Sequence, residues 1–230
     1  MDRISSGIIN LDELLDGGFV YPSTIYLVGE PGSGKTTFAM QFLFEGATKG
    51  EKGLYFSVVG ESAVMILSHM SQFKFFDTTL FGEKIEFIDL SNTLAMEGLD
   101  KAIEAVKKSV ETIEPYRVVI DSITPLLLKT KSQDEHRSLL YDLFLDMKAW
   151  GATTLVVGEV GAKKINVEEY MADAVLKLGF FQKGIESIRY LKIQKVRGVN
   201  HSMMLHNVNI GEDGIEVTRF PDFDVEALKI

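Results

Sequence analysis

Cysteine is absent from this sequence of 230 residues. Its absence excludes a disulfide framework, a thiolate metal site and a cysteine nucleophile. The chain also has no apolar run near the ~18 residues of a membrane span, and residues 1–7 lack the apolar core of a signal peptide. We therefore expect a protein that is soluble and cytoplasmic and does not insert into membranes.

Positive charge is scarce as well. Lys and Arg total 24 against 33 Asp and Glu, which gives a net charge of −9 and an isoelectric point near 5.0. This balance argues against nucleic acid or an anionic membrane as a constant partner, while a local basic patch stays open. The composition is globular, with 46% hydrophobic residues. We expect one domain over residues 1–230, whose last part, about 221–230, forms a poorly ordered tail.

Short apolar runs alternate with segments of helical period along the first 160 residues. The runs predict buried strands at 24–28, 53–59, 85–90, 117–121 and 153–158, and the segments between them predict helices at 34–46, 62–73, 99–113 and 139–150. Four further strands are predicted at 174–181, 186–197, 203–210 and 215–220. The pattern predicts an α/β fold with a mainly parallel central sheet, helices on both faces and antiparallel C-terminal strands.

A glycine-rich segment follows the first predicted strand and opens the first predicted helix. Gly29-Glu30-Pro31-Gly32-Ser33-Gly34-Lys35-Thr36 matches the phosphate-loop pattern G-x-x-x-x-G-K-[ST] at every fixed position. Its glycines let backbone N–H groups turn toward phosphates, and the helix N-terminus favours negative charge. We expect Lys35 to bridge the β- and γ-phosphates of a nucleotide and Thr36 to bind Mg²⁺.

A carboxylate that ends a buried strand of the same sheet complements this loop. The strand Arg117-Val118-Val119-Ile120 ends at Asp121, which is the form of the second nucleotide-binding motif. We expect Asp121 to lie beside the loop and to reach Mg²⁺, often through water; the alternative is a surface cap. Thr36 and Asp121 are thus the predicted metal residues.

Hydrolysis also needs a group that orients water on the γ-phosphate. Glu61 follows the second predicted strand, at the edge of the sheet where the loop is expected. The residue pattern leaves it open whether Glu61 is that base or a solvated loop charge. Glu159 ends the fifth predicted strand and is either a sensor of the nucleotide state or an exposed strand end.

Basic residues gather between residues 177 and 197, although the chain as a whole is acidic. Glu186 is the one acidic residue there, against Lys177, Lys183, Arg189, Lys192, Lys195 and Arg197. One interpretation is an edge strand protected by charge. The other is a cationic finger aimed at a phosphate, formed by Lys195 and Arg197, which share one face of a strand. Such a finger at the far end of the sheet would reach the phosphate loop of a neighbouring subunit rather than its own.

Taken together, these segments resemble the KaiC-like ATPases of the RecA superfamily, as a single-domain member, along the chain to about Phe220. The resemblance is carried by 4–8 and 11–18 near the N-terminus, 32–38 and 41–43 around the loop, 118–122, 168–173, and Lys195-Val196-Arg197-Gly198 with His201. It implies a RecA-like fold and ATP bound between adjacent subunits of a homo-oligomeric ring, typically a hexamer. It further implies that Lys195 and Arg197 act on the neighbour's γ-phosphate, and that His201 and Thr37 lie near the nucleotide.

The sequence departs from this family at one position. The family usually carries two adjacent glutamates after its second strand, whereas Ser57-Val58-Val59-Gly60-Glu61-Ser62 contains one. Two functions therefore stay open: a slow Mg²⁺-dependent ring ATPase of regulatory or signalling type, and a non-turnover ATP switch or scaffold that assembles a still unidentified protein partner, as in archaellum-motor relatives. A RecA-type recombinase or helicase would need a basic loop, and 161–166 is short and weakly basic.

Overall fold

A computed structural model describes residues 2–58, 60, 62–160 and 167–220. Six of its strands run parallel to at least one neighbour: β3 (Thr24–Gly29), β4 (Gly53–Ser57), β5 (Ile85–Asp89), β6 (Arg117–Asp121), β7 (Thr153–Glu159) and β8 (Ala174–Lys183). Three strands of the same sheet have only antiparallel neighbours: β9 (Glu186–Val196), β10 (Leu205–Gly211) and β11 (Gly214–Arg219). Within the described ranges they form one sheet in the order β11-β10-β9-β8-β3-β7-β6-β4-β5.

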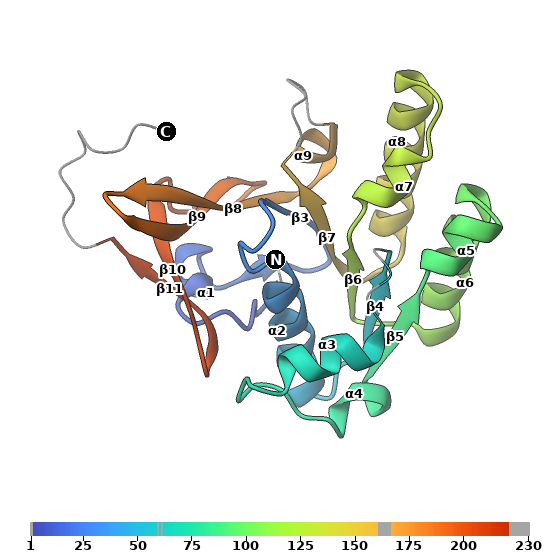
Figure 1. The fold of residues 1–230 in the computed structure, drawn as a ribbon. Coiled ribbons are helices and arrows are strands. Elements are labelled where there is room, and N and C mark those ends of the chain that lie inside the picture. Colours follow the sequence, from blue (N-terminus) through green and yellow to red (C-terminus); the bar gives the residue numbers. More distant parts are fainter. Residues whose placement is uncertain (1, 59, 61, 161–166, 221–230) are drawn as a thin grey trace.

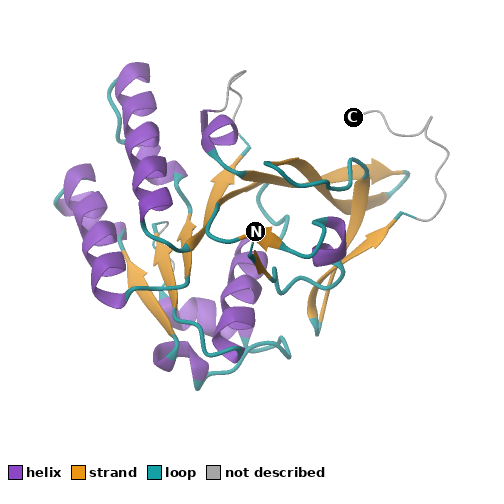
Figure 2. Ribbon diagram, turned by 180° about the vertical axis from the view of Figure 1, so that it is seen from behind, coloured by secondary structure: helices purple, strands orange, loops and turns teal. Residues whose placement is uncertain are grey.

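Helices cover both faces of the parallel part of this sheet (Figures 1 and 2). One face carries α2 (Lys35–Thr48), α3 (Ala63–Met70) and α4 (Leu80–Glu83). The other carries α5 (Ser91–Met96), α6 (Leu99–Ile113), α7 (Thr124–Leu128), α8 (Gln133–Ala149) and α9 (Val167–Met171). None of the helices in the described ranges combines the length and apolarity needed to cross a bilayer.

Alternating side chains of the buried strands supply both hydrophobic cores. Val119 belongs to the core under α2, whereas Val118 and Ile120 belong to the core under α6 and α8. Neighbouring side chains of a strand point to opposite faces, so a run of consecutive apolar residues is what a strand covered on both faces needs. The predicted α/β fold with a mainly parallel central sheet and antiparallel C-terminal strands is confirmed.

Several details differ from the expectation. β8 pairs parallel with β3, so the antiparallel part of the sheet begins at β9. β9 ends at Val196, and Arg197 therefore lies just beyond the strand that was expected to contain it. The periodic pattern also missed β1 (Arg3–Ile4), α1 (Leu11–Leu14) and β2 (Phe19–Val20), which are too short to show a period.

The N-terminal segment lies between the loop-bearing helix α2 and strand β11. Buried Gln41 of α2 donates from Nε2 to the carbonyl of Gly7 (2.7 Å) and accepts at Oε1 from the amide of Ile215 (2.8 Å). Gly7 has φ = 75°, and a Cβ there would lie 2.6 Å from Cβ of Glu45, so only glycine fits. The helix that follows the phosphate loop is thereby attached to the antiparallel end of the sheet.

Arg117, at the start of β6, is almost completely buried, with 1% of its side chain exposed. Its Nε donates to the Glu51 carboxylate (2.6 Å), and its Nη1 donates to the carbonyls of Ser5 and Phe42 (2.8 Å each). The guanidinium also lies 4.6 Å from the ring centroid of Phe42. One side chain thus ties β6 to α2, to the N-terminal segment and to the turn before β4.

We predict that Arg117→Ala lowers the free energy of unfolding by about 3 kcal/mol, because it leaves a partly buried carboxylate, the buried carbonyl of Phe42 and the partly buried carbonyl of Ser5 without their donor. Urea denaturation followed by circular dichroism measures the loss. Lys101→Ala removes a cation from an exposed pair with Glu104 and is the control, for which we expect little change. Equal midpoints for the two variants would contradict the role given to Arg117.

Candidate nucleotide-binding site

The predicted phosphate loop connects the carboxyl end of β3 to the N-terminus of α2. Gly29 ends β3, and Pro31, Gly32, Ser33 and Gly34 form the turn. Gly32 (φ = 76°) and Gly34 (φ = 103°) adopt left-handed backbone conformations that side chains disfavour. At Gly34 an added Cβ would also lie 2.8 Å from Cδ1 of Ile210. Gly32 and Gly34 therefore have backbone conformations in this loop that a residue with a side chain would adopt only under strain.

Lys35 is the first residue of α2, and Thr36 and Thr37 follow in the first turn. The Lys35 ammonium donates to the carbonyls of Gly29 and Glu30 (2.9 Å each), across the base of the loop. Partial burial lowers its pKa, opposed by the nearby carboxylates of Asp121, Glu159 and Glu30. A partly desolvated cation beside an open helix N-terminus is a suitable environment for phosphate.

Thr36 and Asp121 meet as predicted. The Thr36 hydroxyl donates to Oδ2 of Asp121 (2.9 Å), and the Tyr55 hydroxyl donates to the same oxygen (2.7 Å). Asp121 ends β6 and is 6% exposed, and burial raises the pKa of its carboxyl against the opposing effect of these two hydrogen bonds. A hydroxyl and a carboxylate side by side are hard oxygen ligands of the kind that Mg²⁺ prefers.

Two buried hydroxyl groups give a further indication that the loop fits a magnesium nucleotide. The hydroxyl of Ser33, inside the loop, is buried and has no hydrogen-bond partner among the described residues, and the same holds for Ser122, beside Asp121. Buried hydroxyl groups are normally paired. Two such groups at one end of the sheet are consistent with a polar ligand there.

Glu159, the candidate sensor of the nucleotide state, and Glu61, the candidate base, differ in what the structure describes. Glu159 ends β7, is exposed, and lies opposite Gly29 in the pairing of β7 with β3. It therefore stands at the loop edge of the sheet, where it contributes to the raised pKa of Asp121. Glu61 lies outside the described residues, and its role as a base stays a prediction.

Arg189 contacts the loop, although the sequence did not single it out. This β9 residue donates from Nε to the carbonyl of Gly32 (3.4 Å), with its guanidinium 5.4 Å from the ring centroid of Phe180. Together with His69, Gln72 and the start of α2 it borders a cavity of about 360 Å³. Arg189 was counted among the basic residues of the C-terminal strands, but only the pairing register shows which of them lies beside the loop.

Lys195 and Arg197 lie at the other edge of the sheet. Lys195 pairs with Val175 at the start of β8, and the Arg197 amide donates to the carbonyl of Asp173 (2.9 Å), just before that strand. The start of β8 lies beside the start of β3, whereas the loop follows the end of β3, about 16 Å farther along the strand. The finger residues of one subunit therefore do not reach the loop of the same subunit.

His201 follows the finger on the same side. It lies between β9 and β10, where its Nδ1 is 3.1 Å from the carbonyl of Ser202, and the Ser202 amide donates to the carbonyl of Leu14. In the described part of the chain, then, Gly29–Thr37 and Asp121 come together at one edge. Lys195, Arg197 and His201 lie toward the opposite one.

Comparison with known proteins decides the family. The family described as "ATPase: KaiC" matches residues 4–221. The chain belongs to the KaiC ATPase family. This KaiC-family chain is 30% identical over 239 residues to "UPF0273 protein PH0284" of Pyrococcus horikoshii, covering 96% of the chain and 94% of that protein. It is also 30% identical over 228 residues to "Circadian clock protein KaiC2" of Synechocystis sp., where it covers 94% of the chain but 40% of that protein.

A solved structure supports the same assignment. The KaiC-like protein PH0186 of Pyrococcus horikoshii OT3 superposes with a TM-score of 0.83 at 33% identity, covering 96% of this chain and 99% of that one. The resemblance to KaiC-like ATPases and the RecA-like P-loop fold that it implied are therefore confirmed.

We predict that Asp121→Asn stabilises the KaiC-family fold while it weakens Mg²⁺ binding. An amide oxygen can still accept from Thr36 and Tyr55, but a buried charge is removed, so Tm at neutral pH should rise, by about 2–4 °C for each kcal/mol relieved. Because folding raises the pKa of Asp121, the increase in Tm should shrink as the pH falls through the pKa of the folded state. It should vanish below about pH 4, which is the pKa of this carboxyl in the unfolded chain. Apparent Mg²⁺ affinity should fall about 10- to 100-fold.

Thermal melts between pH 3 and 8, and magnesium titrations of nucleotide binding, check both parts of this prediction. Asp142→Asn, an exposed carboxylate on α8, is the control. A lower Tm for Asp121→Asn at neutral pH would contradict the electrostatic interpretation of the buried carboxyl.

Proposed function

We propose that this protein binds ATP with Mg²⁺ and hydrolyses it at the interface between neighbouring copies of a homo-oligomeric ring, a hexamer as the family resemblance implies. In this proposal residues 1–230 act as one ATPase domain with a regulatory or signalling role toward a protein partner still to be identified. Membership of the KaiC ATPase family supports the activity.

The separation of the charged groups supports the shared site. Thr36, Asp121 and the loop lie at one edge of the sheet, and Lys195 and Arg197 lie at the opposite edge. One subunit thus offers a phosphate-binding half at one edge and cations at the other. A head-to-tail arrangement brings the cations of one copy against the phosphate loop of the next copy, and repetition of that contact closes a ring.

The chemistry then follows from the residues of both subunits. The loop amides and Lys35 would hold the β- and γ-phosphates, and Thr36 and Asp121 would hold Mg²⁺, which neutralises charge on the phosphates when bound. Arg189, which contacts the loop of its own subunit, would add a further cation on the nucleotide. Glu61 is our candidate for orienting the attacking water.

Cations from the neighbour would complete this site. Phosphoryl transfer spreads negative charge over the oxygens of the transferred group, and an arginine supplied from outside the loop can raise the rate about 10³- to 10⁵-fold. Lys195 and Arg197 would supply that charge in the neighbouring site. His201 would lie close to the same nucleotide.

A second function is favoured by the segment Ser57–Ser62, which holds a single glutamate. A site that lacks an efficient base would keep ATP bound and use it as a conformational ligand. The protein would then act as a switch or scaffold that assembles a partner. A recombinase or helicase has less support, since the net charge of −9 offers little for a nucleic-acid backbone.

We predict that two inactive variants restore each other's activity. Lys35→Ala loses its own loop cation but keeps its finger, and Arg197→Ala keeps its loop but loses its finger. In an equal mixture, about a quarter of the interfaces would combine an intact loop with an intact finger. Phosphate release from mixed samples, compared with each variant alone, measures the recovery.

Lys192→Ala, which removes an exposed cation from β9, is the matched control for Arg197→Ala and should retain wild-type turnover. Subunit exchange is verified by mass spectrometry of differently sized variants. Full exchange without recovery would rule out the shared site.

We predict that Glu61→Gln lowers the turnover number for ATP about 100-fold or more, because the amide cannot accept the proton of the attacking water. Steady-state kinetics at saturating ATP measure the effect. Glu159→Gln, assayed in parallel, shows whether the carboxylate at the end of β7 has this role instead. Unchanged turnover in Glu61→Gln removes it as the base, and negligible turnover of the unaltered protein favours the switch.

A further inference from the structure

Asp173 stands where α9 ends and β8 begins, and its main chain is fixed on both sides. Its amide donates to the carbonyl of Thr24 at the start of β3 (2.8 Å), and its carbonyl accepts from the Arg197 amide (2.9 Å). The carboxylate adds a third bond, since Oδ2 accepts from the Thr24 amide (3.1 Å). A side chain anchored in this way has a defined position relative to the finger.

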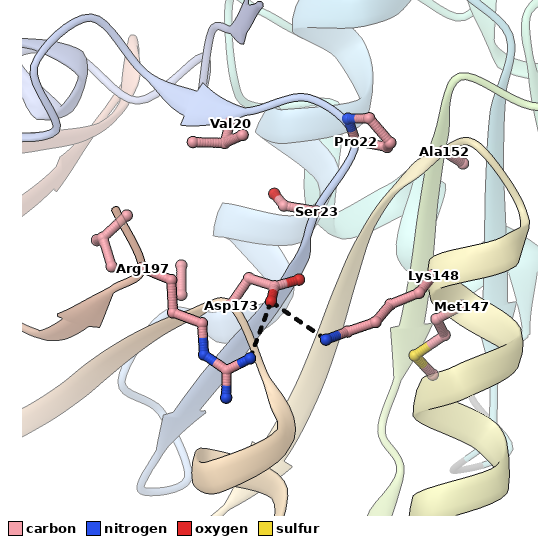
Figure 3. Close-up of a pocket in the computed structure, with 10 residues that line it drawn as sticks. Val20, Pro22, Ser23, Met147, Lys148, Ala152, Asp173 and Arg197 are labelled. Carbon is pink, nitrogen blue, oxygen red and sulfur yellow. Dashed lines mark ion pairs between the residues drawn. The ribbon is translucent and has the colours of Figure 1, made fainter. Parts of the chain in front are cut away.

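The other carboxylate oxygen faces two cations. Oδ1 of Asp173 lies 3.5 Å from Nη1 of Arg197 and 3.3 Å from Nζ of Lys148, which α8 contributes from the opposite side (Figure 3). The three side chains line one cavity of about 290 Å³ at the amino edge of the sheet. Two positive charges share one negative charge here, so the cluster keeps a net positive charge that still attracts an anion.

The guanidinium of Arg197 has a second fixed contact, because Nη2 donates to the carbonyl of Tyr170 in α9 (2.8 Å). The ammonium of Lys195 donates to the carbonyls of Glu169 and Tyr170 (2.7 and 3.1 Å). The last turn of a helix attracts cations, which explains why both side chains gather there. Asp173 and the end of α9 thus hold Arg197 from two directions.

The contacts of Arg197 with Asp173 and with the Tyr170 carbonyl leave up to three of the five N–H donors of its guanidinium for another acceptor. Arginine side chains also lose rotamer entropy when they are fixed. A guanidinium that is held beforehand avoids that loss when charge develops on a phosphate.

We propose that Asp173 is a positioning residue, which aims Arg197 at the phosphate bound by the neighbouring subunit. This inference rests on the proposed function, because it gives Arg197 its task there. Asp173 itself does not touch the phosphate. It acts by fixing the direction of the guanidinium and by moderating the charge that Arg197 shares with Lys148.

Asp173→Asn tests this role with little change to the backbone. Its amide oxygen can keep the bond to Thr24, which turns the NH₂ group toward Arg197 and Lys148 and removes the attraction that held Arg197. We expect the turnover number for ATP to fall about 10-fold or more, with KM for ATP unchanged, because the finger acts on the transition state. Asp173→Glu should restore part of the turnover.

Asp146→Asn is the matched control. It removes a carboxylate of similar exposure from the same edge of the protein, where Asp146 of α8 pairs with Lys107 (2.7 Å), and we expect it to keep wild-type turnover. Equal loss in both carboxylate variants, or a changed KM with an unchanged turnover number, would overturn the inference.

A double variant separates positioning from a structural effect. In the Arg197→Ala background, Asp173→Asn should cause no further loss of the residual turnover, measured in single-turnover assays at high protein concentration, since the group that it positions is gone. A further loss of the same size would show that Asp173 acts independently of Arg197, and would overturn the inference. If Arg197→Ala itself keeps full turnover, the shared site fails. If Arg197→Ala is inactive while Asp173→Asn is fully active, only the positioning role fails.

Discussion

The buried guanidinium of Arg117 fixes how helix α2 lies on strand β6. At one end of this pair, Arg117 donates to the carbonyl of Phe42, and at the other end Thr36 donates to Asp121. Helix and strand are therefore fastened at two points, and the second point is the predicted metal site. Because a buried cation without acceptors is costly, the Arg117 contacts restrict the position of α2 and so the distance between loop and carboxylate.

Much of this arrangement could be read from residue patterns. The continuous apolar run Val118–Ile120 predicted a strand buried on both faces, and the loop motif predicted where β3 gives way to α2. The meeting of Thr36 and Asp121 followed, because parallel strands end at the same edge of a sheet. These are local signals, or consequences of strand direction, and both are visible in one sequence.

Other parts depend on pairing between distant segments. Nothing in the sequence shows that β8 joins β3 in parallel, so the true start of the antiparallel strands could not be placed. For the same reason Arg189 was not recognised beside Gly32, and Asp173 was not recognised beside Arg197. The direction of a basic side chain on a strand depends on register, and a bulge between Val175 and Leu176 shifts the register next to Lys195.

Strand β9 contacts the loop of its own subunit through Arg189 and, six residues later, carries Lys195 toward the other edge. In the proposed ring, each subunit would therefore sense its own nucleotide at one end of a stiff strand and act on its neighbour's at the other. The interface between two subunits is therefore directional, because each subunit would always act on the neighbour that lies on the same side of it in the ring. A change at one nucleotide would travel around the assembly clockwise or anticlockwise, and the handedness would be built into the polarity of a single β-strand.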